Sequence, residues 1–319
     1  MNEHEPDVSI VIVSYNTVDL LRDCLRSIPR SVEPFTHETI VVDNLSRDGS
    51  ADMVEREFPG VRLVRAERNL GFAGGNNAAF RIARGRLVYC LNPDTVSHPG
   101  SLAALVRLLD GDPTLGYVGP KLLNADGTHQ LSAYRFHTVL SGFVSWSMLG
   151  LDRRNPRSPH CLALHHLHGY DTPFEVDWLT GAAILTRRSI IEQVGGYDER
   201  YFLYAEEIEW CWRMHSAGWR GWFEPGAVVT HIRAASTSHL DDSHAFHGHD
   251  PSLLIESHRR LAVQTLGLPA AVASQALHLA GVTLAWLRNV PPMPRRNPGT
   301  RRKAWLWMRY LVRPTSQRR

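Results

Sequence analysis

The sequence has few cysteines, and their spacing argues against a disulfide-stabilised domain and against a zinc-binding domain. The four cysteines lie at irregular intervals, at Cys24, Cys90, Cys161 and Cys211. This spacing gives neither a disulfide framework nor a zinc site, and the 17 histidines also match no zinc template. We therefore expect buried free thiols, which are typical of a reducing cytoplasm.

Several motifs are missing as well. No G-x-G-x-x-G fingerprint follows the first predicted strand, which disfavours an NAD or FAD enzyme. The turn at residues 14–17 lacks the Gly- and Arg-rich, Lys-containing loop that a sugar-phosphate nucleotidyltransferase would carry there. Residues 1–7 contain no apolar run, so we expect no secretory signal.

Charge is divided unevenly along the chain. Residues 251–319 carry twelve Lys or Arg and one acid, Glu256, a net charge of +11, whereas the remainder has 23 bases and 31 acids, a net charge of −8. The aromatic residues among these arginines are Trp286, Trp305, Trp307 and Tyr310. This mixture predicts binding to an anionic membrane surface. Nucleic-acid binding is not expected, because the basic stretch is terminal and carries no nucleic-acid motif.

Within this tail, residues 261–290 are rather apolar. Polar or helix-breaking residues interrupt them, namely Gln264, Pro269, Gln275 and His278. A spanning helix needs about 20 predominantly apolar residues, so we expect a helix that lies in the membrane interface. The alternative is a packed C-terminal helix followed by a disordered basic end.

Three apolar runs that end in polar turns predict buried strands of a parallel sheet. They occupy residues 8–16, 39–44 and 85–95, and helices are predicted between them. This order is typical of a doubly wound α/β fold. Ligands of such sheets bind beyond the carboxyl ends of the strands, where Asp94 would meet a cation on phosphate oxygens.

Eight motifs occur in a specific order over roughly residues 8–235. They are V-S-Y-N at 13–16, V-V-D-N-x-S-x-D-G-S at 41–50, N-L-G-F-A-x-x-N-N at 69–77, N-P-D at 92–94, W-L-T-G-A at 178–182, G-G-Y-D-E-R-Y-F at 195–202, E-E-I-E-W-C-W-R at 206–213 and V-T-H at 229–231. On these motifs the chain resembles inverting glycosyltransferases of the GT-A family two. It is most similar to the rhamnosyltransferase-like bacterial enzymes that build cell-wall and O-antigen linkages.

The resemblance implies a site for Mn²⁺ or Mg²⁺ at Asp94. The family's D-x-D reads Asn92-Pro93-Asp94 here, so one carboxylate stands where two are common. A histidine at the position of His231 completes the metal shell in related enzymes, which implies His231 as a second ligand. The alternative is a histidine at a strand end that only forms hydrogen bonds.

The resemblance also implies a general base at Glu206-Glu207. The pair matches the family's E-D, whose second acid takes the proton of the acceptor, so we expect Glu207 to be the base and keep Glu206 as the alternative. Adjacent carboxylates in a dry cleft repel each other, which raises a pKa toward the range useful for a base. The alternative is an ordinary acidic helix start. We expect Arg213 to pair with Glu206 or Glu209 across one helical turn.

Contacts to the donor and the acceptor follow from the same resemblance. Asp43 is implied for the pyrimidine base. The other implied donor contacts are Ser14, Tyr15 and Asn16 at the base and ribose, and Asn69, Gly71 and Asn77 beside the diphosphate. On the acceptor side, the resemblance implies Asp177 for hydroxyl groups and Trp178 for stacking on a sugar. The alternative for each is a structural role.

We expect a GT-A domain at residues 1–250, with a nucleotide-binding half at about 1–120 and an acceptor half at about 121–250, and a basic, amphipathic helical appendage at 251–319. The expected activity is metal-dependent inverting transfer of a sugar, L-rhamnose from dTDP-rhamnose, to a lipid-linked saccharide. It would occur at the cytoplasmic face of the cell membrane, with the protein bound peripherally. A UDP-hexose or UDP-galactofuranose donor, a non-catalytic nucleotide-sugar-binding homologue, and a homo-oligomer all stay open.

Overall fold

The computed structural model describes residues 5–147, 150–232, 251–289 and 298–312. The chain divides into two compact units. The first comprises residues 1–133 and 168–236, and the second comprises residues 134–167 and 237–319. Residues 134–167, which the sequence places in the acceptor half, therefore belong with the C-terminal helices.

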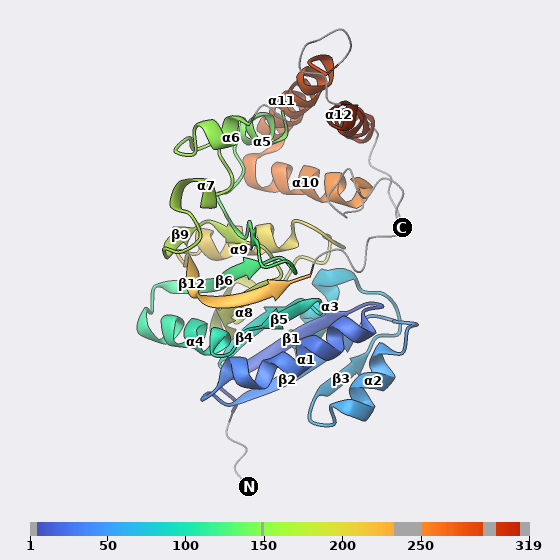
Figure 1. The fold of residues 1–319 in the computed structure, drawn as a ribbon, viewed down its shortest axis with the longest axis vertical. Coiled ribbons are helices and arrows are strands. Elements are labelled where there is room, and N and C mark those ends of the chain that lie inside the picture. The colour runs from blue at the N-terminus through green and yellow to red at the C-terminus, as the bar shows by residue number, and fades with distance from the viewer. Residues whose placement is uncertain (1–4, 148–149, 233–250, 290–297, 313–319) are drawn as a thin grey trace. The chain divides into compact units, whose positions relative to one another are not determined.

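A ten-stranded sheet forms the centre of the first unit (Figure 1). Its main order is β3-β2-β1-β4-β11-β6-β12-β5, while β7 pairs with β6 and β9 pairs with β12. The strands are β1 (Val8–Ser14), β2 (His37–Asp43), β3 (Arg62–Arg65), β4 (Leu87–Leu91), β5 (Thr95–Ser97), β6 (Leu115–Leu123), β7 (His129–Gln130), β9 (Phe174–Val176), β11 (Ala183–Arg187) and β12 (Arg220–His231). Strands β3, β2, β1 and β4 run parallel, as do β6 and β12, which confirms the predicted α/β class.

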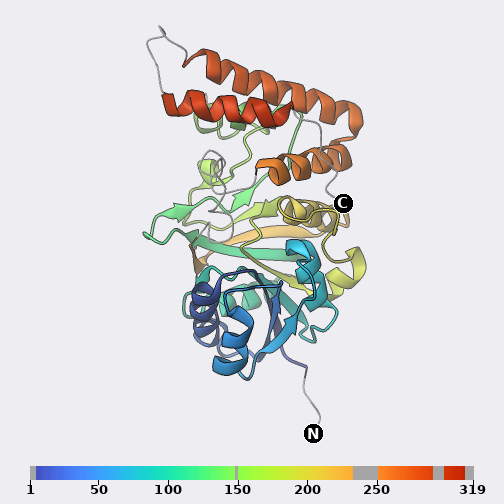
Figure 2. The ribbon, with the colours of Figure 1, turned by 90° about the vertical axis from the view of Figure 1, so that its right-hand side faces the viewer.

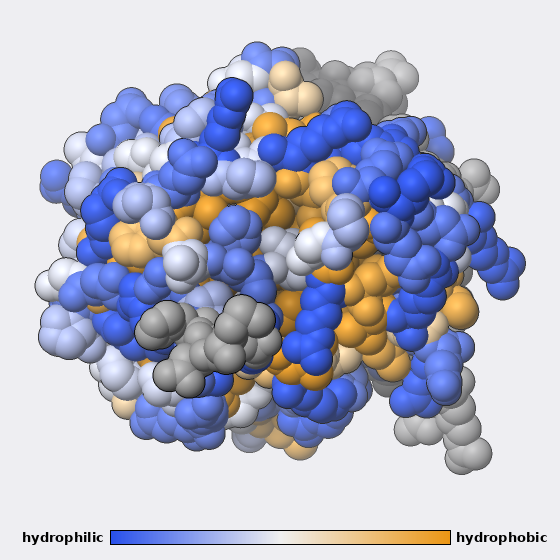
Figure 3. Space-filling view, turned by 90° about the horizontal axis from the view of Figure 1, so that it is seen from below, coloured by the Kyte–Doolittle hydropathy of each residue, from blue (hydrophilic) through white to orange (hydrophobic). Residues whose placement is uncertain are grey.

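Helices cover both faces of this sheet. The helices are α1 (Val18–Val32), α2 (Ser50–Glu57), α3 (Gly71–Phe80), α4 (Ser101–Gly111), α8 (Arg188–Val194) and α9 (Glu206–Ser216). Side chains of a strand alternate between its two faces. Accordingly, Ile10 and Ile12 of β1 join a core cluster with α1, α2 and α4, while Val11 and Val13 join a second cluster with α3. On the face drawn in Figure 3, hydrophilic residues predominate and apolar residues show between them.

The second unit is helical. It contains α5 (Ser141–Trp146), α6 (Leu151–Arg154), α10 (Pro251–Leu266), α11 (Leu268–Leu287) and α12 (Pro298–Leu311). The short elements β8 (Ala133–Tyr134) and α7 (His165–His168) lie where the chain passes between the units, and β10 (Trp178–Leu179) belongs to the first unit. Helix α11 packs against α5, α10 and α12, and its side-by-side course with α12 can be followed in Figure 2. The predicted C-terminal helical appendage is present.

The four cysteines are free and buried, as the spacing predicts. Burial raises the pKa of the Cys24 and Cys90 thiols to about 12. Thiols of this kind remain protonated and unreactive near neutral pH.

Candidate active site

Four residues other than glycine adopt positive φ in the described part of the chain, and all lie in the loops predicted to form the site. They are Asn16 (φ 53), Leu45 (φ 70), Tyr204 (φ 70) and Ala205 (φ 66). The first follows β1, the second follows β2, and the last two directly precede α9. Such conformations cost of order 1–3 kcal/mol each and cluster at ligand sites. The backbone therefore supports one functional region built from these loops.

The loop after β1 is tied to the loop after β2. Asn16 Oδ1 accepts a hydrogen bond from the Arg47 backbone N–H at 2.8 Å. The Ser14 hydroxyl is fully buried and lies 2.9 Å from the Thr17 hydroxyl. The side chains of Ser14 and Asn16 thus help to hold the loop, and Tyr15 is 40% exposed. The donor contacts expected at Ser14, Tyr15 and Asn16 stay predictions.

Asp43 at the end of β2 offers one unused carboxylate oxygen. Its Oδ2 accepts a hydrogen bond from the Ser46 backbone N–H at 3.1 Å. Its Oδ1 is buried and has no hydrogen-bond partner among the described residues. An unsatisfied buried acceptor is costly, so this oxygen is suited to accept a hydrogen bond from a bound ligand.

Asn44 shapes the turn that opens α3, and no sequence motif assigned it this role. Its Nδ2 donates to Asn69 Oδ1 at 2.9 Å and to the Gly71 carbonyl at 3.1 Å, and its Oδ1 accepts from the Leu70 N–H at 2.8 Å. Gly71 has a φ of +71°, and a Cβ there would lie 2.3 Å from the Phe202 carbonyl oxygen. The predicted turn residues Asn69 and Gly71 are therefore held in place by Asn44 and by the close approach of Phe202.

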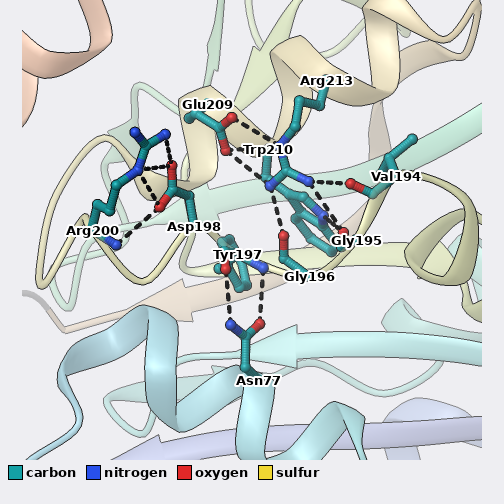
Figure 4. A network of polar contacts seen from close by, with 10 residues as sticks. All are labelled: Asn77, Val194, Gly195, Gly196, Tyr197, Asp198, Arg200, Glu209, Trp210 and Arg213. Atoms are coloured by element: carbon teal, nitrogen blue, oxygen red, sulfur yellow. Dashed lines mark hydrogen bonds and ion pairs between the residues drawn. The ribbon is translucent and has the colours of Figure 1, made fainter. Parts of the chain in front are cut away.

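Asn77 joins α3 to the segment before α9 (Figure 4). Its Nδ2 donates to the Tyr197 carbonyl at 2.8 Å, and its Oδ1 accepts from the Tyr197 N–H at 2.9 Å. A Cβ on Gly196 would lie 2.3 Å from that Oδ1, so the two segments are in close contact. The amide of Asn77 is used within the protein, and its effect on the predicted diphosphate site is to position α3.

The same segment is fixed by a buried ion pair. Arg213 Nε lies 2.8 Å from Glu209 Oε1, and the Glu209 side chain is only 1% exposed. Arg213 also donates to the carbonyls of Val194, Gly195 and Gly196 (Figure 4). The predicted pairing of Arg213 is confirmed with Glu209 as its partner, and it orients the helix that carries Glu206 and Glu207.

Asp94 and His231 face each other at the sheet edge. His231 Nε2 lies 3.4 Å from Asp94 Oδ1, and the two side chains are 11% and 13% exposed. Strand β12 brings them together, because His231 pairs with Thr95 in the antiparallel β12–β5 ladder. The Asp94 carbonyl also accepts the Ile232 N–H at 2.9 Å. Two residues far apart in the sequence thus form one constellation, as the resemblance implies.

The donor set at this edge suits a hard divalent cation that also binds phosphate. Asn92 Nδ2 lies 3.5 Å from His231 Nε2, and Asn92 Oδ1 is buried without a hydrogen-bond partner among the described residues. Within those residues no group of three or more His, Cys, Asp or Glu could hold an ion unaided. Asp94 and His231, the two predicted ligands, would therefore hold a cation only together with phosphate oxygens and water.

Glu206 and Glu207 begin α9 as a coupled acidic pair. Glu206 is 4% exposed and Glu207 is half-buried, and one carboxylate oxygen of each lacks a hydrogen-bond partner in the described part of the chain. Burial, together with repulsion from Glu207, raises the pKa of Glu206 well above its usual value. Burial raises the pKa of Glu207 to about 7, against backbone hydrogen bonds that favour its charged form. Burial therefore disfavours the charged form of both acids.

The turn between β10 and β11 connects the acidic pair to the Asp94 edge. A Cβ on Gly181 would lie 3.5 Å from the Glu207 Cβ, so the turn packs against that side chain. The next residue, Ala182, accepts the Asn92 N–H at 2.9 Å. Glu207 and the Asn92–Asp94 segment therefore contact adjacent residues of one short turn.

The predicted acceptor residues precede this turn. Trp178 is 8% exposed, so little of its ring can stack on a sugar. Asp177 is half-buried, and its carbonyl accepts the Tyr117 hydroxyl at 2.5 Å. Of the two, Asp177 is the better placed to reach an acceptor.

The family model for "Glycosyl transferase family 2" matches residues 9–169. An N-acetylglucosaminyl-diphospho-decaprenol L-rhamnosyltransferase of Mycobacterium tuberculosis is 32% identical over 249 residues, which cover 74% of this chain and 79% of that protein. The rhamnosyltransferase WbbL of Escherichia coli is 26% identical over 235 residues, which cover 70% of this chain and 83% of that protein.

Solved structures share the fold. The mannosyltransferase PcManGT from Pyrobaculum calidifontis, in complex with GDP-Man and Mn²⁺, has a TM-score of 0.56 at 20% identity, covering 97% of this chain and 86% of that one. GalNAc-T7 with UDP, GalNAc and Mn²⁺ has a TM-score of 0.51 at 18% identity, covering 73% of this chain and 44% of that one. The likeness at this identity concerns the α/β architecture.

Proposed function

Because this chain belongs to glycosyl transferase family 2 and is a glycosyltransferase, we propose that it catalyses metal-dependent inverting transfer of L-rhamnose from dTDP-rhamnose to a lipid-linked saccharide. The observation that carries the proposal is one turn that contacts both predicted sites. Gly181 packs against Glu207, whose pKa is raised to about 7, and Ala182 accepts the Asn92 N–H beside the Asp94–His231 pair.

The proposed reaction consists of one proton transfer to Glu207 and one displacement at the anomeric carbon of the donor sugar. The Glu207 carboxylate accepts the proton of the acceptor hydroxyl, whose oxygen forms the new bond to the anomeric carbon. The bond from that carbon to the diphosphate oxygen breaks on the opposite face, and its electron pair leaves with the nucleoside diphosphate. A bound Mn²⁺ or Mg²⁺ would neutralise charge on that leaving group. The products are a glycoside of inverted configuration, a nucleoside diphosphate and a proton that Glu207 returns to water.

The buried arrangement of the acids supports Glu207 as the base. A base works best when its pKa lies near the working pH, which fits the value of about 7 for Glu207. Burial and the Glu207 charge both disfavour the ionised form of Glu206, which makes Glu206 the weaker candidate for the proton acceptor.

The donor assignment rests on the relatives and on Asp43. Two of the similar proteins are rhamnosyltransferases by name. The unused Asp43 Oδ1 can accept the imide N–H of a thymine or uracil base, which favours a pyrimidine donor. A UDP-hexose or UDP-galactofuranose meets the same requirement and is the alternative donor.

The second unit supports an acceptor presented at a membrane. The apolar residues exposed along one stripe of α11 include Leu268, Val272, Leu284 and Leu287. By length and composition α11 could cross a membrane, but its other side packs on α5, α10 and α12. On α12, Trp305 is 48% exposed and the Arg309 guanidinium lies 5.6 Å from its ring. We infer that these helices lie in the interface of an anionic membrane, at its cytoplasmic face.

A donor panel tests the proposal. Purified protein is given dTDP-rhamnose, UDP-glucose or UDP-galactofuranose with Mn²⁺ or Mg²⁺ and a polyprenyl-diphosphate sugar in anionic vesicles, and nucleoside diphosphate release is measured. We expect release from dTDP-rhamnose that depends on metal and acceptor. Release of nucleoside diphosphate only from a UDP-sugar would overturn the assignment of dTDP-rhamnose as the donor. Donor binding without turnover would support a non-catalytic homologue. Equal transfer without metal would overturn the proposed metal dependence.

A further inference from the structure

We propose that Gln130 is a positioning residue that holds the His231 ring with its proton on Nδ1 and its Nε2 lone pair directed at Asp94. The inference rests on the proposed function in one respect, namely that Asp94 and His231 hold a divalent cation. It concerns a residue to which no sequence motif points.

Gln130 reaches His231 through the sheet. It lies on the short strand β7 and pairs with Leu122 of β6, and Leu122 also pairs with Val229 of β12. The Gln130 residue is 3% exposed, so its amide must find partners within the protein. Its neighbours across β6 are the last residues of β12, which end at His231.

Two hydrogen-bond acceptors determine the positions of the nitrogen and the oxygen in the Gln130 side-chain amide. Nε2 donates to Asn124 Oδ1 at 2.8 Å and to the His231 carbonyl at 2.9 Å. Asn124 is itself oriented, because its Nδ2 donates to the Thr128 hydroxyl at 2.8 Å. Only an NH₂ group can satisfy both acceptors, so the Oε1 of Gln130 must be the atom on the other side.

That oxygen selects the tautomer of His231. Gln130 Oε1 lies 2.9 Å from His231 Nδ1, and an amide oxygen can only accept, so Nδ1 must carry a proton. In the neutral imidazole Nε2 is then an acceptor, 3.4 Å from Asp94 Oδ1 and 3.5 Å from the Asn92 Nδ2 donor. Its lone pair lies beside the Asp94 carboxylate, which is the arrangement of a metal-ligating histidine oriented by its second nitrogen.

Gln130 also restrains the ring and the backbone of the same residue. The Gln130 amide accepts a hydrogen bond from the His231 ring and donates one to the His231 carbonyl. One amide group therefore restrains both the imidazole ring and the backbone of His231. Loss of such an outer partner typically costs 10–100-fold in metal affinity.

The test measures the histidine tautomer and Mn²⁺ affinity separately. In ¹⁵N-labelled, metal-free protein above pH 7.5, we expect a protonated Nδ1 and an unprotonated Nε2 for His231, assigned by comparison with His231→Gln. Gln130→Met keeps the length of the side chain and removes both hydrogen-bonding groups. We expect it to show mixed tautomers and 10–100-fold weaker Mn²⁺ binding, measured by the free-Mn²⁺ electron paramagnetic resonance signal with dTDP present.

Two further variants make the result specific. Gln193→Met is the matched control, because Gln193 accepts a hydrogen bond from Trp219 Nε1 in the same unit, and it should bind Mn²⁺ as wild type does. Gln130→Glu keeps an acceptor opposite Nδ1 and should retain the Nδ1 proton. A wild-type His231 protonated on Nε2, or Gln130→Met with unchanged tautomer and affinity, would overturn the inference.

Failure of the proposed metal site has a different signature. In that case wild type itself would bind no Mn²⁺ and Asp94→Ala would change nothing. If only the inference about Gln130 fails, wild-type binding stays intact and Asp94→Ala abolishes it. The wild-type ¹⁵N spectrum needs no substitution at Gln130, so it decides the tautomer even if Gln130→Met does not fold.

Discussion

Glu207 accepts a backbone hydrogen bond from Gly181, which lies in the turn whose next residue, Ala182, holds Asn92. The hydrogen bond favours the charged form of Glu207, but burial outweighs it and leaves the pKa at about 7. The position of Glu207, the proposed base, is thereby linked to the segment that carries Asp94.

Substitution of the two acids should separate their roles. Glu207→Gln removes the proton acceptor, and we expect kcat to fall by about 10²–10⁴-fold with little change in donor binding. Glu206→Gln replaces a carboxyl whose charged form is disfavoured by burial and by Glu207, so kcat should change less than about tenfold. Steady-state kinetics with the same donor and acceptor check both. The opposite order of losses would identify Glu206 as the base.

Activity should rise with pH through the titration of Glu207. The base acts only when deprotonated, so kcat/KM should be low well below the pKa of about 7, increase through it and reach a plateau above it. A pH profile of kcat/KM from 5.5 to 8.5 at fixed free Mn²⁺ tests this. A profile that is flat across neutral pH would contradict the assignment.

The raised pKa of Glu207 should also lower stability at high pH. Its pKa is about 7 in the folded protein and near 4.5 when the chain is unfolded. The unfolded chain therefore loses its proton first, and stability falls as pH rises from about 4.5 to 7, by up to about 3 kcal/mol. Glu207→Gln does not titrate, so it should be more stable than wild type at pH 8 and equal at pH 4.5. Guanidinium denaturation at both pH values measures the difference.

Breaking the Glu209–Arg213 pair should cost much more than breaking a surface pair. Arg213→Met removes the guanidinium that pairs with the buried Glu209 carboxylate, which should lower the free energy of unfolding by about 3–5 kcal/mol. The control is Arg220→Met, since Arg220 and Glu175 are 41% and 51% exposed and their pair contributes at most about 1 kcal/mol. Equal losses in urea denaturation would show that the Glu209 pair is not a buried one in solution.

Local patterns predicted much of the fold and part of the site. The apolar run at residues 8–16 predicted a buried strand of a parallel sheet, and Ile10 and Val11 of β1 join different core clusters. Motif order placed His231 with Asp94, and the two are neighbours. These features depend on periodicity or on whole motifs, which a single sequence displays.

Contacts between residues that lie far apart in the sequence could not be predicted from such local patterns. Gln130 meets His231 only because β6 lies between their strands, and no local signal in residues 124–130 indicates that pairing. Asn77 fits a loop motif, yet its amide is used by Tyr197. Residues 134–167 carry no marker of the helices with which they pack.

The most direct test of the account follows anomeric configuration and metal dependence in one experiment. Proton NMR of a reaction with dTDP-rhamnose and a lipid-linked acceptor reads the configuration of the new linkage, first with Mn²⁺, then with a chelator, then with Asp94→Ala. The account predicts a single inverted product with Mn²⁺ and none in the other two samples. A retained configuration, or an undiminished rate with the chelator, would contradict it.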